Sequence, residues 1–189
     1  MFKPQPSHVA SQPPSQPQSA PAAIEFAPRP PKTNDATSDH AAILSWLKTS
    51  LSTIYLAAAR SPYQDGPPKL TRGAYLDTYS ATLDYSVGAI HCRRGYKVPY
   101  FDPLYSCLQE TIKTHCIGIR ADVFVPGNSS GVDGARRLIG EYVAHWEILV
   151  RVTALVSNLL RHLEGLWIKK RINGGQSGIH MIRDLHMMT

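Results

Sequence analysis

The strongest constraint on the fold is a long run of apolar residues near the C-terminus that has helical spacing. Between residues 138 and 166, large apolar side chains recur at steps of three and four residues, the period of an α-helix. The chain contains no proline after Pro126, and Gly174-Gly175 forms a helix stop signal. We therefore expect one helix from about residue 135 to 173, roughly 58 Å long if unbroken. Such a helix predicts an elongated rod rather than a globule.

The long helix carries apolar residues on two of its sides. Ile139, Val143 and Trp146 form a second stripe beside the first. Neighbouring elements must cover both sides if these residues are to leave water. We therefore assign Trp146 and Trp167 to the hydrophobic core.

The N-terminal region has a composition that opposes folding. Nine of the 15 prolines fall within the first 31 residues, among Gln, Ser and Ala. Such a segment cannot bury enough apolar surface to offset its ordering entropy. We expect residues 1–37 to form a disordered tail and residues 38–189 to form the folded domain. The tail lacks the apolar stretch of a secretory signal.

The remaining helices are marked by capping residues. Helix starts are expected at Ser38 or Asp39, at Thr71, at Asp102 before Pro103, and at Asp133.

The helix that begins at Asp102 is expected to end near Gly118. Ile179, Ile182 and Leu185 then open a fifth helix after the glycine pair. A short apolar run at residues 123–125 has no partner strand, so the order of elements is all-helical. The predicted fold class is an all-α, elongated five-helix bundle.

Charge and cysteine content set limits on the function. The formal charge is +6, which leaves nucleic acid and acidic proteins open as partners. Three cysteines without CxxC spacing suggest neither a disulfide framework nor a zinc site. No apolar run is long enough to predict a membrane span. We expect a reducing compartment, the cytoplasm or nucleus, and no cofactor.

Three segments resemble the N-terminal repeat of cullins, the scaffolds of multisubunit ubiquitin ligases. The first is GAYLDTYSATLDYS, with Tyr75, Leu76 and Tyr79 at the positions of the cullin second-helix pattern. The second is EYVAHWEILVRVTALVSNLLRHLEGLWIKKR, where Tyr stands four residues before Trp-Glu and a later Leu-x-x-x-Trp precedes basic residues. The third is GQSGIHMIRDLHMM, which is similar to the Gly-x-x-Gly-Ile segment of the family.

The resemblance implies a function and a set of site residues. It implies a non-catalytic scaffold fragment that docks a BTB/POZ-fold adaptor of the Skp or BTB type, in ubiquitin-dependent protein catabolism. It also implies that the regions which hold the RING-box protein would lie beyond Thr189, so no RING-box binding is expected. The adaptor-binding residues that it implies are Tyr75, Leu76, Tyr79, Thr82, Leu163 and Glu164.

Other interpretations of the same residues stay open. The tyrosine-bearing stripe of the second helix can also be an ordinary core stripe. The positive charge allows a nucleic-acid-binding helical domain, although no helix is dense in Arg, Asn and Gln. A truncated cullin paralogue without activity is a third possibility.

An enzyme is the least favoured class. Its best candidates are the thiol and imidazole pairs His91-Cys92 and His115-Cys116. Adjacent residues of a helix point about 100° apart, and no oxyanion loop accompanies either pair.

Overall fold

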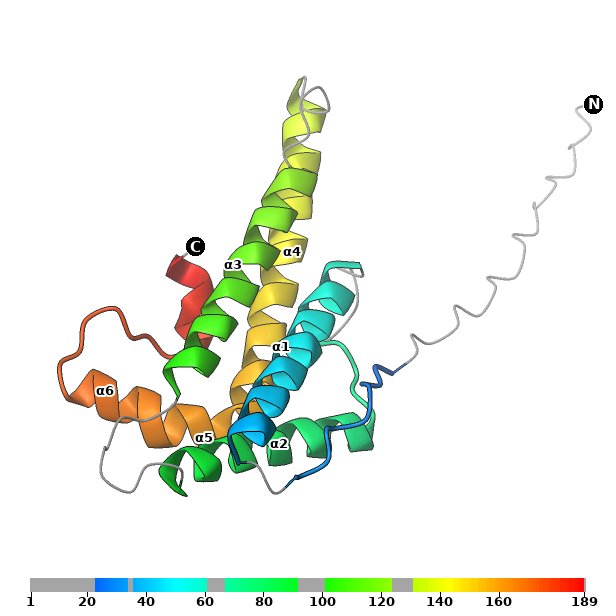
Figure 1. The fold of residues 1–189 in the computed structure, drawn as a ribbon. Coiled ribbons are helices and arrows are strands. Elements are labelled where there is room, and N and C mark those ends of the chain that lie inside the picture. Colours follow the sequence, from blue (N-terminus) through cyan, green and yellow to red (C-terminus); the bar gives the residue numbers. More distant parts are fainter. Residues whose placement is uncertain (1–22, 34–35, 61–66, 92–100, 124–130, 189) are drawn as a thin grey trace, which may run out of the picture.

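A computed structural model describes residues 23–33, 36–60, 67–91, 101–123 and 131–188 (Figure 1). Within these ranges the chain is all-helical, as predicted, apart from an isolated parallel bridge between Ile24 and Leu70. The elements are α1 (Ala36–Arg60), α2 (Arg72–His91), α3 (Asp102–Val123), α4 (Val132–Leu159), α5 (Arg161–Leu163), a π-helical turn (Glu164–Ile168), α6 (Lys169–Asn173) and a 3₁₀ helix (Ile182–Met188).

An antiparallel hairpin of α3 and α4 forms the long axis of the molecule. Its distal end projects beyond the other helices, which makes the bundle elongated (Figure 1). Helix α1 packs against the lower part of this hairpin and against α2. Helix α2 crosses beneath, in contact with α1, α4 and α5. The C-terminal 3₁₀ helix lies along α3 and α4.

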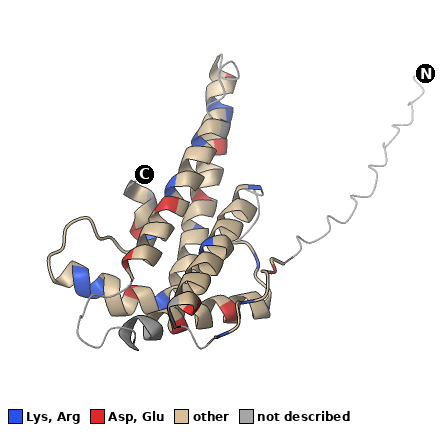
Figure 2. Cartoon of the chain, in the orientation of Figure 1, with Lys and Arg blue, Asp and Glu red and all other residues tan. Residues whose placement is uncertain are grey.

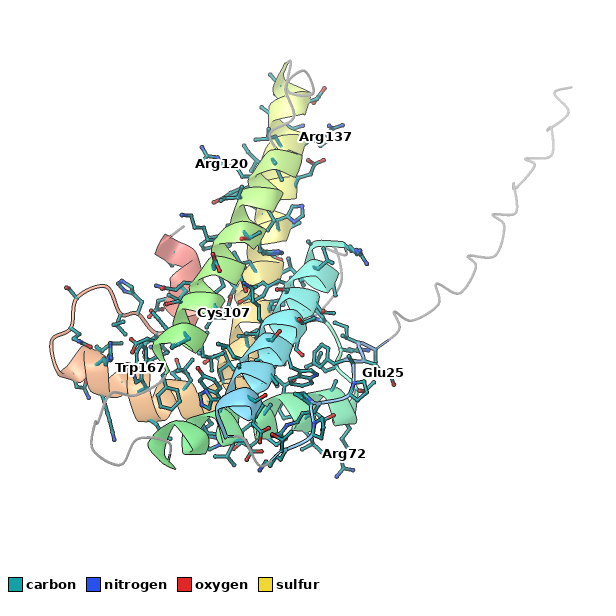
Figure 3. The ribbon with its side chains drawn as sticks, in the orientation of Figure 1. Glu25, Arg72, Cys107, Arg120, Arg137 and Trp167 are labelled. Carbon is teal, nitrogen blue, oxygen red and sulfur yellow. The ribbon has the colours of Figure 1, made fainter. Side chains whose placement is uncertain are left out.

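One apolar core joins all of these elements in the lower part of the bundle. Within this core Trp167 packs against the start of α3 (Figure 3). Its ring centroid lies 5.2 Å from that of Tyr105 and 6.3 Å from that of Phe101. The largest fully buried side chains are Trp167, Tyr55, Tyr85, Leu47, Leu51, Ile54, Leu104, Leu108, Ile112, Ile148, Leu159 and Leu160.

The predicted single helix over residues 135–173 is wrong, because the chain bends by 74° between α4 and α5. Leu160 leaves helical geometry at the bend, with φ −97° and ψ 23°. The bend turns α5 and α6 under the bundle, where Trp167 and Ile168 are buried. A straight helix would carry these two side chains past the core and into water. The predicted stop is confirmed: Gly174 caps α6, and Gly175 has φ +74°.

The helix starts agree with the sequence in part. Thr71 caps α2 as predicted, since its Oγ1 accepts a hydrogen bond of 3.1 Å from the backbone N–H of Ala74. Helix α4 begins at Val132, one residue before Asp133, and Gly131 rather than Asp133 stands at the cap. Asp133 lies in the first turn, where its charge still favours the helix dipole.

The other two starts also differ in detail. Helix α3 includes Asp102, the predicted cap, so it begins one residue earlier than predicted, and it runs past Gly118 to Val123. Helix α1 begins at Ala36, ahead of both predicted caps. Asp39 reaches back instead, and its carboxylate accepts a 2.9 Å hydrogen bond from the backbone N–H of Thr33.

The N-terminal boundary of the folded part lies earlier than residue 38. Residues 23–33, which we call the strap, pack on α1 and α2. Phe26 meets Trp46 edge-on at 5.9 Å, and Trp46 donates a 2.9 Å hydrogen bond to the carbonyl of Ala27. Composition did not predict the strap, because the strap has few apolar residues of its own and these pack on the apolar surface of the bundle. Residues 1–22 of the predicted tail lie outside the described residues.

The two tryptophans of the long segment have different surroundings. Trp167 is buried, as predicted. Trp146 is only half-buried and lies outside the core, so its assignment to the core was wrong. It lies on α4 two residues before Ile148, the first buried residue of that helix.

The described helices show no single membrane-spanning segment by length and apolarity. Only the bent pair α4 and α5–α6, taken together, meets that criterion.

Candidate protein-docking site

Apart from Tyr85, the buried side chains of α2 are small or carry hydroxyl groups. Thr78, Thr82 and Ser86 are buried, and each donates its hydroxyl to the carbonyl four residues earlier, at 2.8, 2.9 and 2.6 Å. These local bonds satisfy the hydroxyl groups without partners from other helices. Within the described side chains of α2, Tyr85 is the one large group that enters the core.

Four other apolar side chains of α2 lie at or near its surface. Leu76 is 51% exposed, and Tyr75 and Leu83 are each 36% exposed. Tyr79 is half-buried between them. These four residues, Tyr75, Leu76, Tyr79 and Leu83, are called the α2 face below. Among the described residues of α2 the core-stripe interpretation therefore fails for Tyr75, Leu76 and Leu83.

Tyr79 is fixed in place by α5. Its hydroxyl lies 2.9 Å from Nε2 of His162, and the two ring centroids are 5.0 Å apart. This pair joins the α2 face to the helix that follows the bend. This contact could not be predicted from the sequence, because 83 residues separate the partners.

The other implied adaptor-binding residues lie deeper. Thr82 and Leu163 are fully buried in the bundle, so neither can touch a partner at the surface of this fold. Glu164 is half-buried, and its carboxylate accepts a 2.7 Å hydrogen bond from the hydroxyl of Ser157. Of the six residues implied by the resemblance, Tyr75 and Leu76 are exposed, and Tyr79 and Glu164 are partly accessible.

The strap borders the α2 face on one side. Arg29 pairs with Asp84 and donates a 3.0 Å hydrogen bond to the hydroxyl of Ser80, while Lys32 lies 3.0 Å from Asp84. Partial burial would raise the pKa of the Asp84 carboxyl, but the hydrogen bonds from Arg29 and Lys32 hold it below its ordinary value. The edge of the α2 face is thus charged and paired, as in the polar rim of an interface.

The charge distribution gives little support to a nucleic-acid site. Lys and Arg alternate with acidic residues along the helices, with one compact basic group on α6 (Figure 2). Within that group, Arg171 makes intramolecular contacts: its guanidinium lies 3.0 Å from the carboxylate of Asp102 and 4.4 Å from the ring centroid of Trp167. Lys169 and Lys170 are exposed. The loop that contains Arg93, Arg94 and Lys97 lies outside the described residues.

The candidate thiol and imidazole groups do not form a constellation in the part of the chain that the structure describes. His115 and Cys116 are both half-buried in α3, and the ring of His115 packs on Tyr55 at 5.2 Å. The side chains of His91 and Cys92 lie outside the described residues. Burial raises the pKa of the Cys107 thiol, so the reactive thiolate is disfavoured there. No group of three metal-ligating side chains occurs among the residues described.

No protein-family model, curated protein or solved structure matches the chain. The site is therefore interpreted from its own geometry.

Proposed function

We propose that the chain is a non-catalytic scaffold that docks a folded adaptor on the α2 face. The observation that carries the proposal is the pattern of exposure on α2: Thr78 and Thr82 are buried, while the α2 face carries exposed Tyr and Leu side chains. Contiguous exposed apolar side chains with a polar rim are typical of protein interfaces. Tyrosine in particular gives large contact area at low rotamer-entropy cost.

The kind of adaptor follows from the resemblance to cullins. Tyr75, Leu76 and Tyr79 occupy the cullin second-helix positions, and these residues reach the surface of α2. We therefore infer a BTB/POZ-fold adaptor of the Skp or BTB type. Leu83 extends the face by about one helical turn beyond Tyr79 and takes the place of the buried Thr82 in the contact set. The scaffold would act in ubiquitin-dependent protein catabolism.

The test measures adaptor affinity by isothermal titration, with one Skp-type and one BTB-type adaptor as probes. The double variant Tyr75→Ser/Leu76→Ser should lower affinity at least about tenfold, because apolar anchors carry most interface energy. Helicity and melting temperature should stay near those of the parent, since both residues are exposed.

The matched control is Leu56→Ser on α1, which removes an equally exposed leucine (52%) away from α2. It should bind as the parent does. If neither adaptor binds the parent, or if the double variant folds and binds as tightly as the parent, the docking proposal is wrong. Binding to duplex DNA or RNA at moderate salt in place of an adaptor would favour the nucleic-acid alternative.

A further inference from the structure

A second apolar surface, separate from the α2 face, runs along α4. Val132, Ile139, Val143 and Val150 are between 42% and 77% exposed. They follow one another at steps of seven, four and seven residues, so at about 100° per residue all four fall within roughly 40° of one another. We call these four residues the α4 stripe.

The α4 stripe faces away from the bundle. The buried residues of α4, such as Ile148, Val152 and Val156, lie on the opposite side of the helix. The distal hairpin, where Arg120 and Arg137 project into water, extends beyond α1 and α2 (Figures 1 and 3). No described element covers the stripe, and an exposed apolar row of this length indicates an interaction surface.

The spacing of the stripe is symmetric along the helix. Val132 and Val150 are each nine residues from position 141, and Ile139 and Val143 are each two residues from it. A second copy of α4, packed antiparallel about a two-fold axis at that position, would place Val132 opposite Val150 and Ile139 opposite Val143. A two-fold contact requires such self-complementarity.

The charges beside the stripe match the same arrangement. Arg136 and Glu147 lie on the same flank of α4, about five and six residues from the axis on opposite sides of it. In an antiparallel pair, residues of the same flank meet across the interface. Arg136 of each copy would therefore lie beside Glu147 of the other, twice by symmetry. A parallel two-fold pair would instead place the two Arg136 side chains on opposite flanks of the interface, away from Glu147 of the other copy.

These side chains are available for a contact between copies. Arg136 and Asp133, 3.8 Å apart within one copy, are 81% and 100% exposed, so their ion pair is weak. Glu147 lies 3.1 Å from Arg151 and is 59% exposed, which leaves carboxylate surface for a second cation.

We propose that the α4 stripe binds a second copy of the chain, in an antiparallel two-fold dimer centred near position 141. Four apolar side chains per copy are less than a standard stable interface provides, so the dimer is weak. Its dissociation constant should lie on the order of 10–100 µM. The proposal does not depend on the adaptor.

Sedimentation equilibrium of the full chain between about 5 and 500 µM tests the dimer; this range brackets the expected constant. The parent should pass from monomer to dimer. Ile139→Ser/Val143→Ser should remain monomeric throughout with unchanged helicity. The matched controls Leu56→Ser and Leu76→Ser, which remove exposed leucines from α1 and α2, should dimerise as the parent does.

A charge exchange tests the orientation. Arg136→Glu and Glu147→Arg should each raise the dissociation constant at least about fivefold, because each creates two like-charge contacts. The double variant Arg136→Glu/Glu147→Arg should restore most of the lost affinity. Three outcomes would each overturn the proposal. The parent stays monomeric even at about 500 µM, the Ile139→Ser/Val143→Ser variant still dimerises, or the Arg136→Glu/Glu147→Arg variant does not regain affinity.

Discussion

At the scale of single residues, similar side chains have different roles because of where α4 bends. Trp146 and Trp167 both lie on apolar stripes of the same long segment, and the sequence assigned both to the core. The bend at Leu160 brings Trp167 under the bundle, while Trp146 lies on α4 before Ile148, the first buried residue of that helix. Periodicity shows which residues share a side of a helix, and it does not show where a neighbouring helix stops covering that side.

The two tryptophans therefore make a matched pair for mutation. Trp167→Ala should lower the free energy of unfolding by about 3–5 kcal/mol, because it leaves a cavity beside Phe101 and Tyr105. Trp146→Ala should lower it by only about 1 kcal/mol, since that side chain is half-buried. Urea denaturation followed by circular dichroism measures both. A larger loss for Trp146→Ala would place that residue in the core after all.

At the scale of elements, the strap is the part of the fold that the composition of the sequence did not predict. It is held by a ring contact, a hydrogen bond to Trp46 and the ion pairs of Arg29 and Lys32 with Asp84. We predict that removal of residues 1–33 lowers the free energy of unfolding by at least about 2 kcal/mol, because Phe26 and the bond to Trp46 are lost.

The matched control for the strap is removal of residues 1–22 alone. Its Pro/Gln/Ser-rich composition predicts no stabilising contacts, so the melting temperature should stay within about a degree or two of the parent. Hydrogen exchange should then show α1 amides near Trp46 protected in the shorter deletion and exposed in the longer one. Equal stability of the two truncated chains would mean that the strap contributes nothing.

The sequence predicted the elements better than their arrangement. Helical periodicity, the Thr71 cap and the glycine stop at Gly174 are local signals, and the structure confirms them. The bend at Leu160 has no proline or glycine to mark it; it follows from the burial of Trp167 and Ile168. For α2, only the fold shows that Tyr75 and Leu76 are exposed while Thr78, Thr82 and Tyr85 are buried.

At the scale of the whole molecule, acid should weaken the fold through a half-buried histidine of α3. His115 on α3 is packed against Tyr55, and its Nε2 is buried with no hydrogen-bond partner among the described residues. Burial, together with the nearby positive charge that His145 can carry, lowers the pKa of His115 from 6.5 to about 4. The folded chain therefore binds this proton less readily than the unfolded chain does.

The sign of the effect follows from linkage. The pKa of His115 is about 4 in the folded state and 6.5 in the unfolded state. Between these two pH values the unfolded state holds more protons at His115, so stability falls as pH falls. The loss at pH 5 relative to pH 7 should be about 2 kcal/mol. Asp84 acts in the same direction but at lower pH, because its already low carboxyl pKa is lowered further. Of these two groups, His115 is therefore the one that changes the stability between pH 7 and 5.

His115→Gln isolates this contribution, since glutamine has similar size and does not titrate in that range. Urea unfolding of parent and variant at pH 7 and pH 5 should give a smaller loss of stability in the variant, by about 2 kcal/mol. His180→Gln, at a partly exposed histidine on the loop before the 3₁₀ helix, serves as the control and should keep the parental pH dependence. If parent and His115→Gln lose stability equally between these pH values, the buried imidazole does not couple acid to unfolding, and the source must be sought in the carboxylates.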